Sequence, residues 1–134
     1  MKLYTFHQSG SSYRVRIALN LKGIDYEAVF VKGGRGSEDL RSPAYLELNP
    51  QAVVPTLVHN GRVFTQSLAI IEYLEDVHPS PALLPHGAEG RARVRALAQL
   101  VVSDMQPLIA ARVIDYLDSE IRITSDQQGD WLRH

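Results

Sequence analysis

The hexapeptide Ser9-Gly10-Ser11-Ser12-Tyr13-Arg14 carries three serine hydroxyls at the boundary between two segments of different pattern. Alternating apolar residues precede it, and apolar residues at helical spacing follow it. A strand that runs into a helix leaves the first N–H groups of that helix without intrahelical partners. These donors, the helix dipole and the hydroxyls together favour an anion. The alternative interpretation is that one serine simply caps the helix.

The composition limits which chemistry this turn can support. The chain contains no cysteine, so sulfur chemistry here needs a thiol brought in from outside. The lack of cysteine also suits the reducing cytoplasm, where we expect the protein to reside. A net charge of −1 gives no global field for nucleic acid or an anionic membrane, and no apolar run approaches a membrane span. The five histidines are scattered without ligand spacing, so no metal site is predicted.

A second candidate site is the dipeptide Val54-Pro55, inside the strand-like run 53–57. Proline cannot donate to a sheet ladder, so it belongs at an edge, at a strand start or beside a turn. A cis peptide bond would present the backbone N–H and C=O of Val54 to an extended peptide ligand. The other interpretation is an ordinary trans proline at a strand start.

A third candidate site is Gln66-Ser67, at the start of another helical pattern. Ser67 either caps this helix or receives a carboxylate through its hydroxyl and backbone N–H. Gln66 could hold an amine or amide nearby. A helix N-terminus for a thiolate, an exposed backbone for a peptide and a second helix N-terminus for a carboxylate together describe a receptor for a small acidic thiol peptide.

The order of predicted elements is strand, helix, strand, helix, strand, strand, helix, which is the arrangement of a thioredoxin-like α/β domain. The strands are expected at 2–6, 26–31, 53–58 and 62–65, and the helices at 13–21, 37–48 and 67–77, the second of them short, irregular and broken at Pro43. A glycine-rich loop is predicted at 32–36 and a hairpin turn at Asn60-Gly61. Prolines mark a linker at 79–87. Beyond it, a long helical stretch is predicted from 88, interrupted by Pro107 and followed by a last helix from Ser125.

Four segments, 9–19, 22–26, 49–57 and 66–74, resemble the zeta class of glutathione transferases, which includes maleylacetoacetate isomerase and maleylpyruvate isomerase. The resemblance implies a thioredoxin-like glutathione-binding domain over 1–78, the linker 79–87, and the first part of an all-helical domain over 88–134. It also implies a homodimer in the full-length form. Members of the class are longer than this chain.

The resemblance also implies a set of site residues. Catalytic roles fall on Ser9, Ser11 and Arg14, and substrate carboxylates on Arg14 and Arg112. Glutathione contacts fall on Ser9, Gly10, Ser11, Ser12, Gln51, Val54, Pro55, Gln66, Ser67 and Gln106. Many zeta enzymes carry Ser-Ser-Cys-Ser at this turn, whereas here Ser11 takes the cysteine position and leaves the thiolate-stabilising hydroxyl to Ser9. Ser-Gly followed by a hydroxyl residue is closer to the maleylpyruvate branch.

The implied reaction is the glutathione-dependent cis–trans isomerisation of a conjugated oxo-diacid in aromatic catabolism, with glutathione as co-substrate and no metal. Addition of the thiolate, rotation about a single bond and elimination would accomplish it. The partner is therefore a small acidic electrophile. Two alternatives stay open at this point: a general glutathione transferase or dehalogenase, and a non-catalytic glutathione-binding module.

Overall fold

The computed structural model describes residues 1–32 and 36–134. Part of the predicted glycine-rich loop, residues 33–35, lies outside the described residues. The chain divides into two units, unit 1 from Met1 to Leu83 and unit 2 from Leu84 to His134. This boundary falls within the predicted linker 79–87.

Unit 1 is built on a four-stranded sheet of order β2-β1-β3-β4. The strands are β1 (Lys2–Thr5), β2 (Glu27–Phe30), β3 (Thr56–His59) and β4 (Arg62–Thr65). Strands β1 and β2 are parallel, and the other two pairs are antiparallel. Tyr4 pairs with Thr56, and Thr56 pairs with Thr65. The ends of β1 and β4 and the beginning of β3 therefore meet at one end of the sheet.

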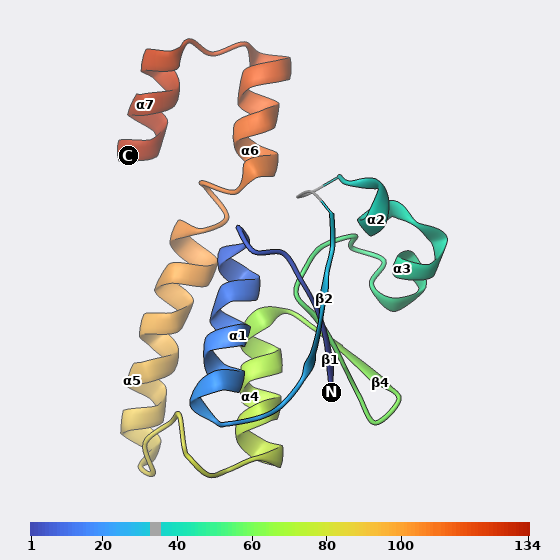
Figure 1. Ribbon diagram of the computed structural model, residues 1–134. Helices are drawn as coiled ribbons and strands as arrows, with labels where there is room; N and C mark the ends of the chain where they lie inside the picture. The colour runs from blue at the N-terminus through green and yellow to red at the C-terminus, as the bar shows by residue number, and fades with distance from the viewer. Residues whose placement is uncertain (33–35) are drawn as a thin grey trace. The chain divides into compact units, whose positions relative to one another are not determined.

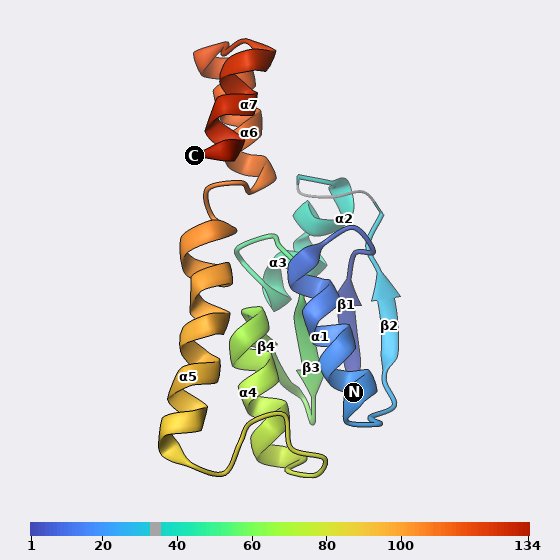
Figure 2. The same cartoon turned by 90° about the vertical axis from the view of Figure 1, so that its left-hand side faces the viewer.

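Helices cover both faces of this sheet (Figure 1). Helices α1 (Gly10–Leu21) and α4 (Ser67–Val77) lie side by side on one face, and α2 (Glu38–Arg41) and α3 (Pro43–Leu48) lie on the other (Figure 2). Side chains alternate across a strand, so Leu3 enters the core beneath α1 and α4 while Tyr4 packs on the other side. The first core consists of Leu3, Val15, Leu19, Leu57, Ile70 and Leu74, all fully buried. Burial of one such side chain contributes about 1.5–3 kcal/mol.

The predicted thioredoxin-like order of elements is confirmed, with one local difference, at the start of β3. The break predicted at Pro43 is confirmed, because α2 ends at Arg41 and α3 begins at Pro43, where the Ser42 hydroxyl caps α3 by accepting from the Tyr45 N–H at 3.3 Å. The strand expected from residue 53 begins at Thr56. Pro55 has no N–H to donate, and the Val53 carbonyl accepts hydrogen bonds from side chains instead of the ladder. The hairpin turn at Asn60-Gly61 is as predicted, with both residues at positive φ.

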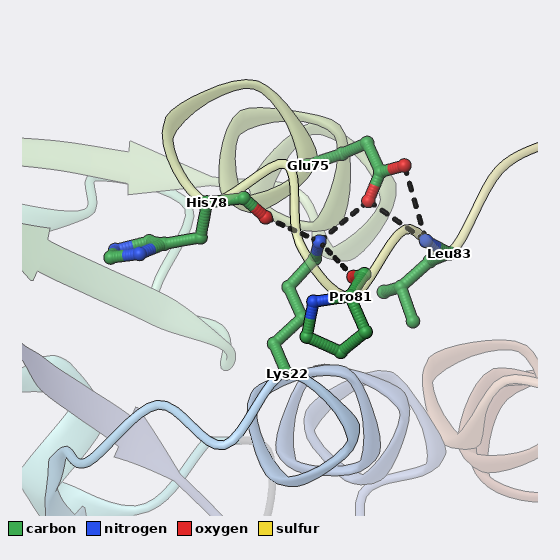
Figure 3. Close-up of polar contacts among 5 residues, drawn as sticks. All are labelled: Lys22, Glu75, His78, Pro81 and Leu83. Atoms are coloured by element: carbon green, nitrogen blue, oxygen red, sulfur yellow. Dashed lines mark hydrogen bonds and ion pairs between the residues drawn. The ribbon is translucent and has the colours of Figure 1, made fainter. Parts of the chain in front are cut away.

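A buried ion pair holds the end of unit 1 (Figure 3). Lys22 Nζ lies 2.6 Å from Glu75 Oε2, with the two side chains 0% and 8% exposed. The same ammonium donates to the carbonyls of His78 at 2.7 Å and Pro81 at 3.0 Å. The Glu75 carboxylate also accepts the Leu83 N–H, at 3.0 and 3.1 Å from its two oxygens. Three donors on Lys22 thus meet three acceptors, and residues 78–83 are fixed against α1 and α4.

Unit 2 is helical. It contains α5 (Ala88–Gln99), which continues into a π-helical turn η1 (Leu100–Met105), then α6 (Ala111–Tyr116), which continues into η2 (Leu117–Ile121), and finally α7 (Ser125–Arg133). The predicted break near Pro107 falls between η1 and α6. None of these helices, all within the described residues, contains a buried residue. No described helix of the chain is both long and apolar enough to cross a membrane.

Candidate functional site

Three loops meet where β1 and β4 end and β3 begins. Strand β1 leads through a short loop to Ser9, β4 leads directly to Gln66 and Ser67, and Val54 lies just before β3. The pairing of Tyr4 with Thr56 and of Thr56 with Thr65 brings these loops to the same end of the sheet. The three sequence-predicted sites of unit 1 therefore form one region of the structure.

Ser9 is the N-cap of α1. Its Oγ accepts the Ser12 N–H at 3.2 Å, so the capping interpretation is correct. A hydroxyl that accepts through a lone pair still carries its own proton, and Ser9 can cap the helix and donate to an anion at once. Gly10 is exposed and Ser11 is partly exposed. Ser12 is 0% exposed, and its expected contact with glutathione stays a prediction.

Ser67 is the first residue of α4 and not its cap. The residue in the cap position is Gln66, which makes no side-chain capping bond. The Ser67 hydroxyl instead accepts from Arg14 Nη1 at 2.8 Å. Desolvation lowers the pKa of Arg14 from its ordinary value, yet an arginine keeps its charge in proteins. A partly buried cation therefore joins the N-terminal turns of α1 and α4, where each helix dipole already favours an anion.

Gln51 and Gln66 lie together beside Ser67. The Gln66 side-chain amide donates to Gln51 Oε1 at 3.0 Å. Both residues are exposed, so their remaining amide groups are accessible to a polar ligand. Gln66 has φ +67°, a strained value for a residue with a side chain, and such strain persists where the surroundings enforce it. The two predicted glutamines thus form one polar edge next to the start of α4.

The segment around Val54 is fixed by two buried side chains that sequence reasoning missed. The Val54–Pro55 peptide bond is cis. Tyr45 Oη donates to the Val53 carbonyl at 2.7 Å, and Asn49 Nδ2 donates to the same carbonyl at 2.9 Å. Burial raises the pKa of Tyr45, so its hydroxyl stays protonated and can donate. The ladder with β1 begins at Thr56, and Val54 lies beyond that paired segment.

The sequence pattern around Asn49 gives only a weak indication of its role. Asn49 precedes Pro50 and forms an Asx turn, in which its Oδ1 accepts the Gln51 N–H at 3.1 Å. That local pattern predicts a turn but gives no reason for burial. Asn49 is nevertheless 1% exposed, and its buried amide is satisfied in part by donating to Thr56 Oγ1 at 3.1 Å.

Gln106 and Arg112 belong to unit 2. Gln106 follows η1 and is half-buried, and Arg112 lies in α6 and is exposed. Their expected contacts with glutathione and with substrate carboxylates stay predictions.

Comparison with known proteins identifies the first unit. Residues 3–82 match the family model described as glutathione S-transferase, N-terminal domain. The chain is 51% identical over 117 residues to maleylpyruvate isomerase of Ralstonia sp., covering 87% of this chain and 54% of that protein. It is 49% identical over 135 residues to maleylacetoacetate isomerase of Pseudomonas aeruginosa, covering 100% of this chain and 63% of that protein.

Solved structures agree with the sequence matches. A holo structure of maleylpyruvate isomerase, a bacterial zeta-class glutathione S-transferase, superposes with a TM-score of 0.89 at 46% identity, covering 98% of this chain and 61% of that one. Maleylacetoacetate isomerase from Methylobacterium extorquens AM1, with bound malonate and GSH, also gives 0.89, at 42% identity and 99% and 62% coverage. This chain thus spans 54–63% of the length of these relatives. The resemblance to the zeta class is confirmed, and the chain belongs to the glutathione S-transferase family.

Proposed function

We propose that unit 1 binds glutathione and that the protein isomerises a conjugated oxo-diacid, maleylpyruvate or maleylacetoacetate, with glutathione as co-substrate. The observation that carries this proposal is the Arg14–Ser67 hydrogen bond, which joins two helix N-termini at one end of the sheet. Such a site suits a ligand with an anion at each end. The relatives named maleylpyruvate and maleylacetoacetate isomerase, and the GSH in one similar structure, support the choice of ligand.

Three parts of a bound glutathione, the thiol, the cysteinyl backbone and the γ-glutamyl end, have candidate partners in unit 1. The thiol end would lie at the start of α1, next to Ser9 and the exposed Gly10. The cysteinyl backbone would pair with Val54, whose segment is held in place by Tyr45. The γ-glutamyl carboxylate would lie at Ser67, and Gln66 would hold the amine. The 2.8 Å contact of Arg14 with Ser67 supports binding of the γ-glutamyl carboxylate as the first role of Arg14.

The chemistry that glutathione supplies when bound is the reversible addition of its thiolate to a conjugated double bond. A free thiol has a pKa of about 8.5, and lowering it by ~2 units requires about 2.7 kcal/mol of preferential anion stabilisation. A hydrogen bond to a charged group contributes about 1.5–3 kcal/mol, and a helix N-terminus about 0.3–1 kcal/mol. The Ser9 hydroxyl and the start of α1 are together sufficient. Arg112, and Arg14 as its second role, would hold substrate carboxylates and stabilise the enolate.

The rest of the proposal concerns the whole protein. Gln106 would contact glutathione from the helical part, and the full-length protein would form a homodimer in the cytoplasm. The lack of cysteine is consistent with that compartment.

A non-catalytic glutathione-binding module is the second candidate. One observation favours it: no described helix of unit 2 contains a buried residue. The test is to measure glutathione binding by calorimetry and turnover of maleylpyruvate and maleylacetoacetate by loss of their conjugated absorbance, both on this chain. Glutathione-dependent turnover supports the isomerase. Binding without turnover supports the module, turnover of haloacids or aryl halides alone supports a general transferase, and absence of binding rejects all three.

A further inference from the structure

The guanidinium of Arg16 lies across the loop that joins β1 to α1. Its Nη1 donates to Thr5 Oγ1 at 3.0 Å and to the Phe6 carbonyl at 3.2 Å, and its Nη2 donates to the His7 carbonyl at 3.2 Å. The guanidinium carbon also lies 5.4 Å from the centre of the Tyr13 ring, a cation–π distance. One side chain thus binds the last residue of β1, Thr5, and the first two residues of the loop, Phe6 and His7.

The loop that Arg16 holds is the one that ends at Ser9. The Phe6 carbonyl accepts from Arg16 and also accepts the Ser9 N–H at 3.1 Å. The other end of the contact is rigid, because Thr5 is fully buried and its carbonyl accepts the Val31 N–H at 3.0 Å. Arg16 therefore connects a fixed point in the sheet to the turn that determines where Ser9 lies.

We infer that Arg16 is a positioning residue that places the Ser9 hydroxyl against the thiol of bound glutathione. This inference rests on the proposed glutathione site and adds a residue outside that site. An arginine suits the task because its planar fork carries five N–H donors in a fixed geometry, so several acceptors can be held in one arrangement. A lysine ammonium is a point charge on a flexible stem and would hold fewer of these groups. The core already fastens α1 to the sheet, so the contacts of Arg16 act chiefly on the loop.

The test compares the pKa of the bound glutathione thiol with the affinity for a ligand that has no thiol. We would titrate the thiol of glutathione bound to the full 134-residue chain by its thiolate absorbance, and measure the affinity for S-methylglutathione, which has no thiol. Arg16→Met is expected to raise the pKa of the bound thiol by about one unit, a tenfold loss of thiolate at pH below that pKa. Its affinity for S-methylglutathione should stay within about threefold of wild type. For Arg16→Lys, the pKa of the bound thiol is expected to lie between the values of wild type and Arg16→Met. Arg62 is an exposed arginine of β4, and Arg62→Met should change neither the thiol pKa nor the affinity for S-methylglutathione.

Two results would overturn the inference: an unchanged thiol pKa in Arg16→Met, or equal losses of affinity for glutathione and S-methylglutathione. If Arg16→Met does not fold, Thr5→Val removes one acceptor of the fork with little change of shape. A smaller rise in thiol pKa then supports the role of Arg16, and no rise refutes it. A wild-type chain that does not bind glutathione at all would reject the proposed function itself, and this inference with it.

Discussion

The guanidinium of Arg14 and the hydroxyl of Ser67 form a 2.8 Å hydrogen bond between residues 53 positions apart in the chain. The contact links the first turns of α1 and α4, so the two anion-binding ends of the proposed site are not independent. Each of the variants Arg14→Met and Ser67→Ala should weaken glutathione binding by about tenfold, as expected for one charge-assisted hydrogen bond. The double variant should lose less than the product of the two, because both changes remove the same contact. Calorimetric titration of the four proteins measures the coupling, and strictly additive losses would contradict it.

Ser9 and Ser42 offer a matched comparison, because both cap helices through their hydroxyls. Replacement of either by alanine should lower the free energy of unfolding by about 1 kcal/mol. Only Ser9→Ala should also raise the pKa of the bound glutathione thiol, by about one to two units, because it removes a hydrogen bond to the thiolate. Urea unfolding and ultraviolet titration of the thiolate test the two effects. A thiol that titrates alike in both variants would show that Ser9 is a cap and nothing more.

Much of unit 1 could be predicted from its sequence, because local signals and the final fold agree there. The positive φ at Gly23 and at Asn60-Gly61 ends α1 and turns the hairpin, as the residue types indicate. The starts of α1 and α4 could be predicted in the same way, which is why Ser9 and Ser67 were candidates. That Arg14 turns toward Ser67 could not be predicted, since its direction depends on a partner in another helix.

The sequence did not predict which polar residues are buried in the folded protein. The burial of Lys22 and Glu75 was not predicted, and it depends on residues 78–83, which pack over the pair and bond to it. Asn49 is similar, because its partners Val53 and Thr56 come together only when the turn has formed. The roles of Gln106 and Arg112 stay predictions, because they lie in unit 2.

Removing one partner of the Lys22–Glu75 pair should lower the free energy of unfolding strongly, whereas replacing both partners together should lower it much less. Removing one partner leaves an uncompensated buried charge, so Lys22→Met or Glu75→Gln is expected to cost about 3–5 kcal/mol of unfolding free energy. Lys22→Met combined with Glu75→Met should cost clearly less than the sum of the two charge-removing changes. Glu27→Gln is the control, because the Lys2–Glu27 pair is 41% and 62% exposed and should contribute less than about 1 kcal/mol. Equal effects at both pairs in chemical denaturation would refute this expectation.

His59 should make stability depend on pH on the acidic side of neutrality. Its Nδ1 lies 2.8 Å from the Tyr73 hydroxyl oxygen, and desolvation, followed by the charges of the chain N-terminus and His78, lowers its pKa. The unfolded chain, with a histidine pKa of about 6.5, therefore binds the proton more tightly than the native state. The stability that the neutral ring contributes is fully present above this value and is lost as pH falls toward the lower, native pKa.

His59→Gln should accordingly show a shallower loss of unfolding free energy between about pH 7 and pH 5 than wild type does. Urea denaturation at several pH values measures the slope. His86→Gln, an exposed position in unit 2, serves as the control and should follow wild type. A parallel decline in wild type and His59→Gln would show that His59 does not contribute to the acid sensitivity.

The interactions of Lys22 also determine the shortest fragment that can fold alone. Helix α4 ends at Val77, but the Pro81 carbonyl and the Leu83 N–H complete the shells of the two buried charges. A polypeptide cut after Val77 would retain the lysine and the glutamate but would lose the His78 and Pro81 carbonyls and the Leu83 N–H that bond to them. Autonomous folding of unit 1 should therefore require the chain to continue through Leu83, beyond the last residue of its regular secondary structure.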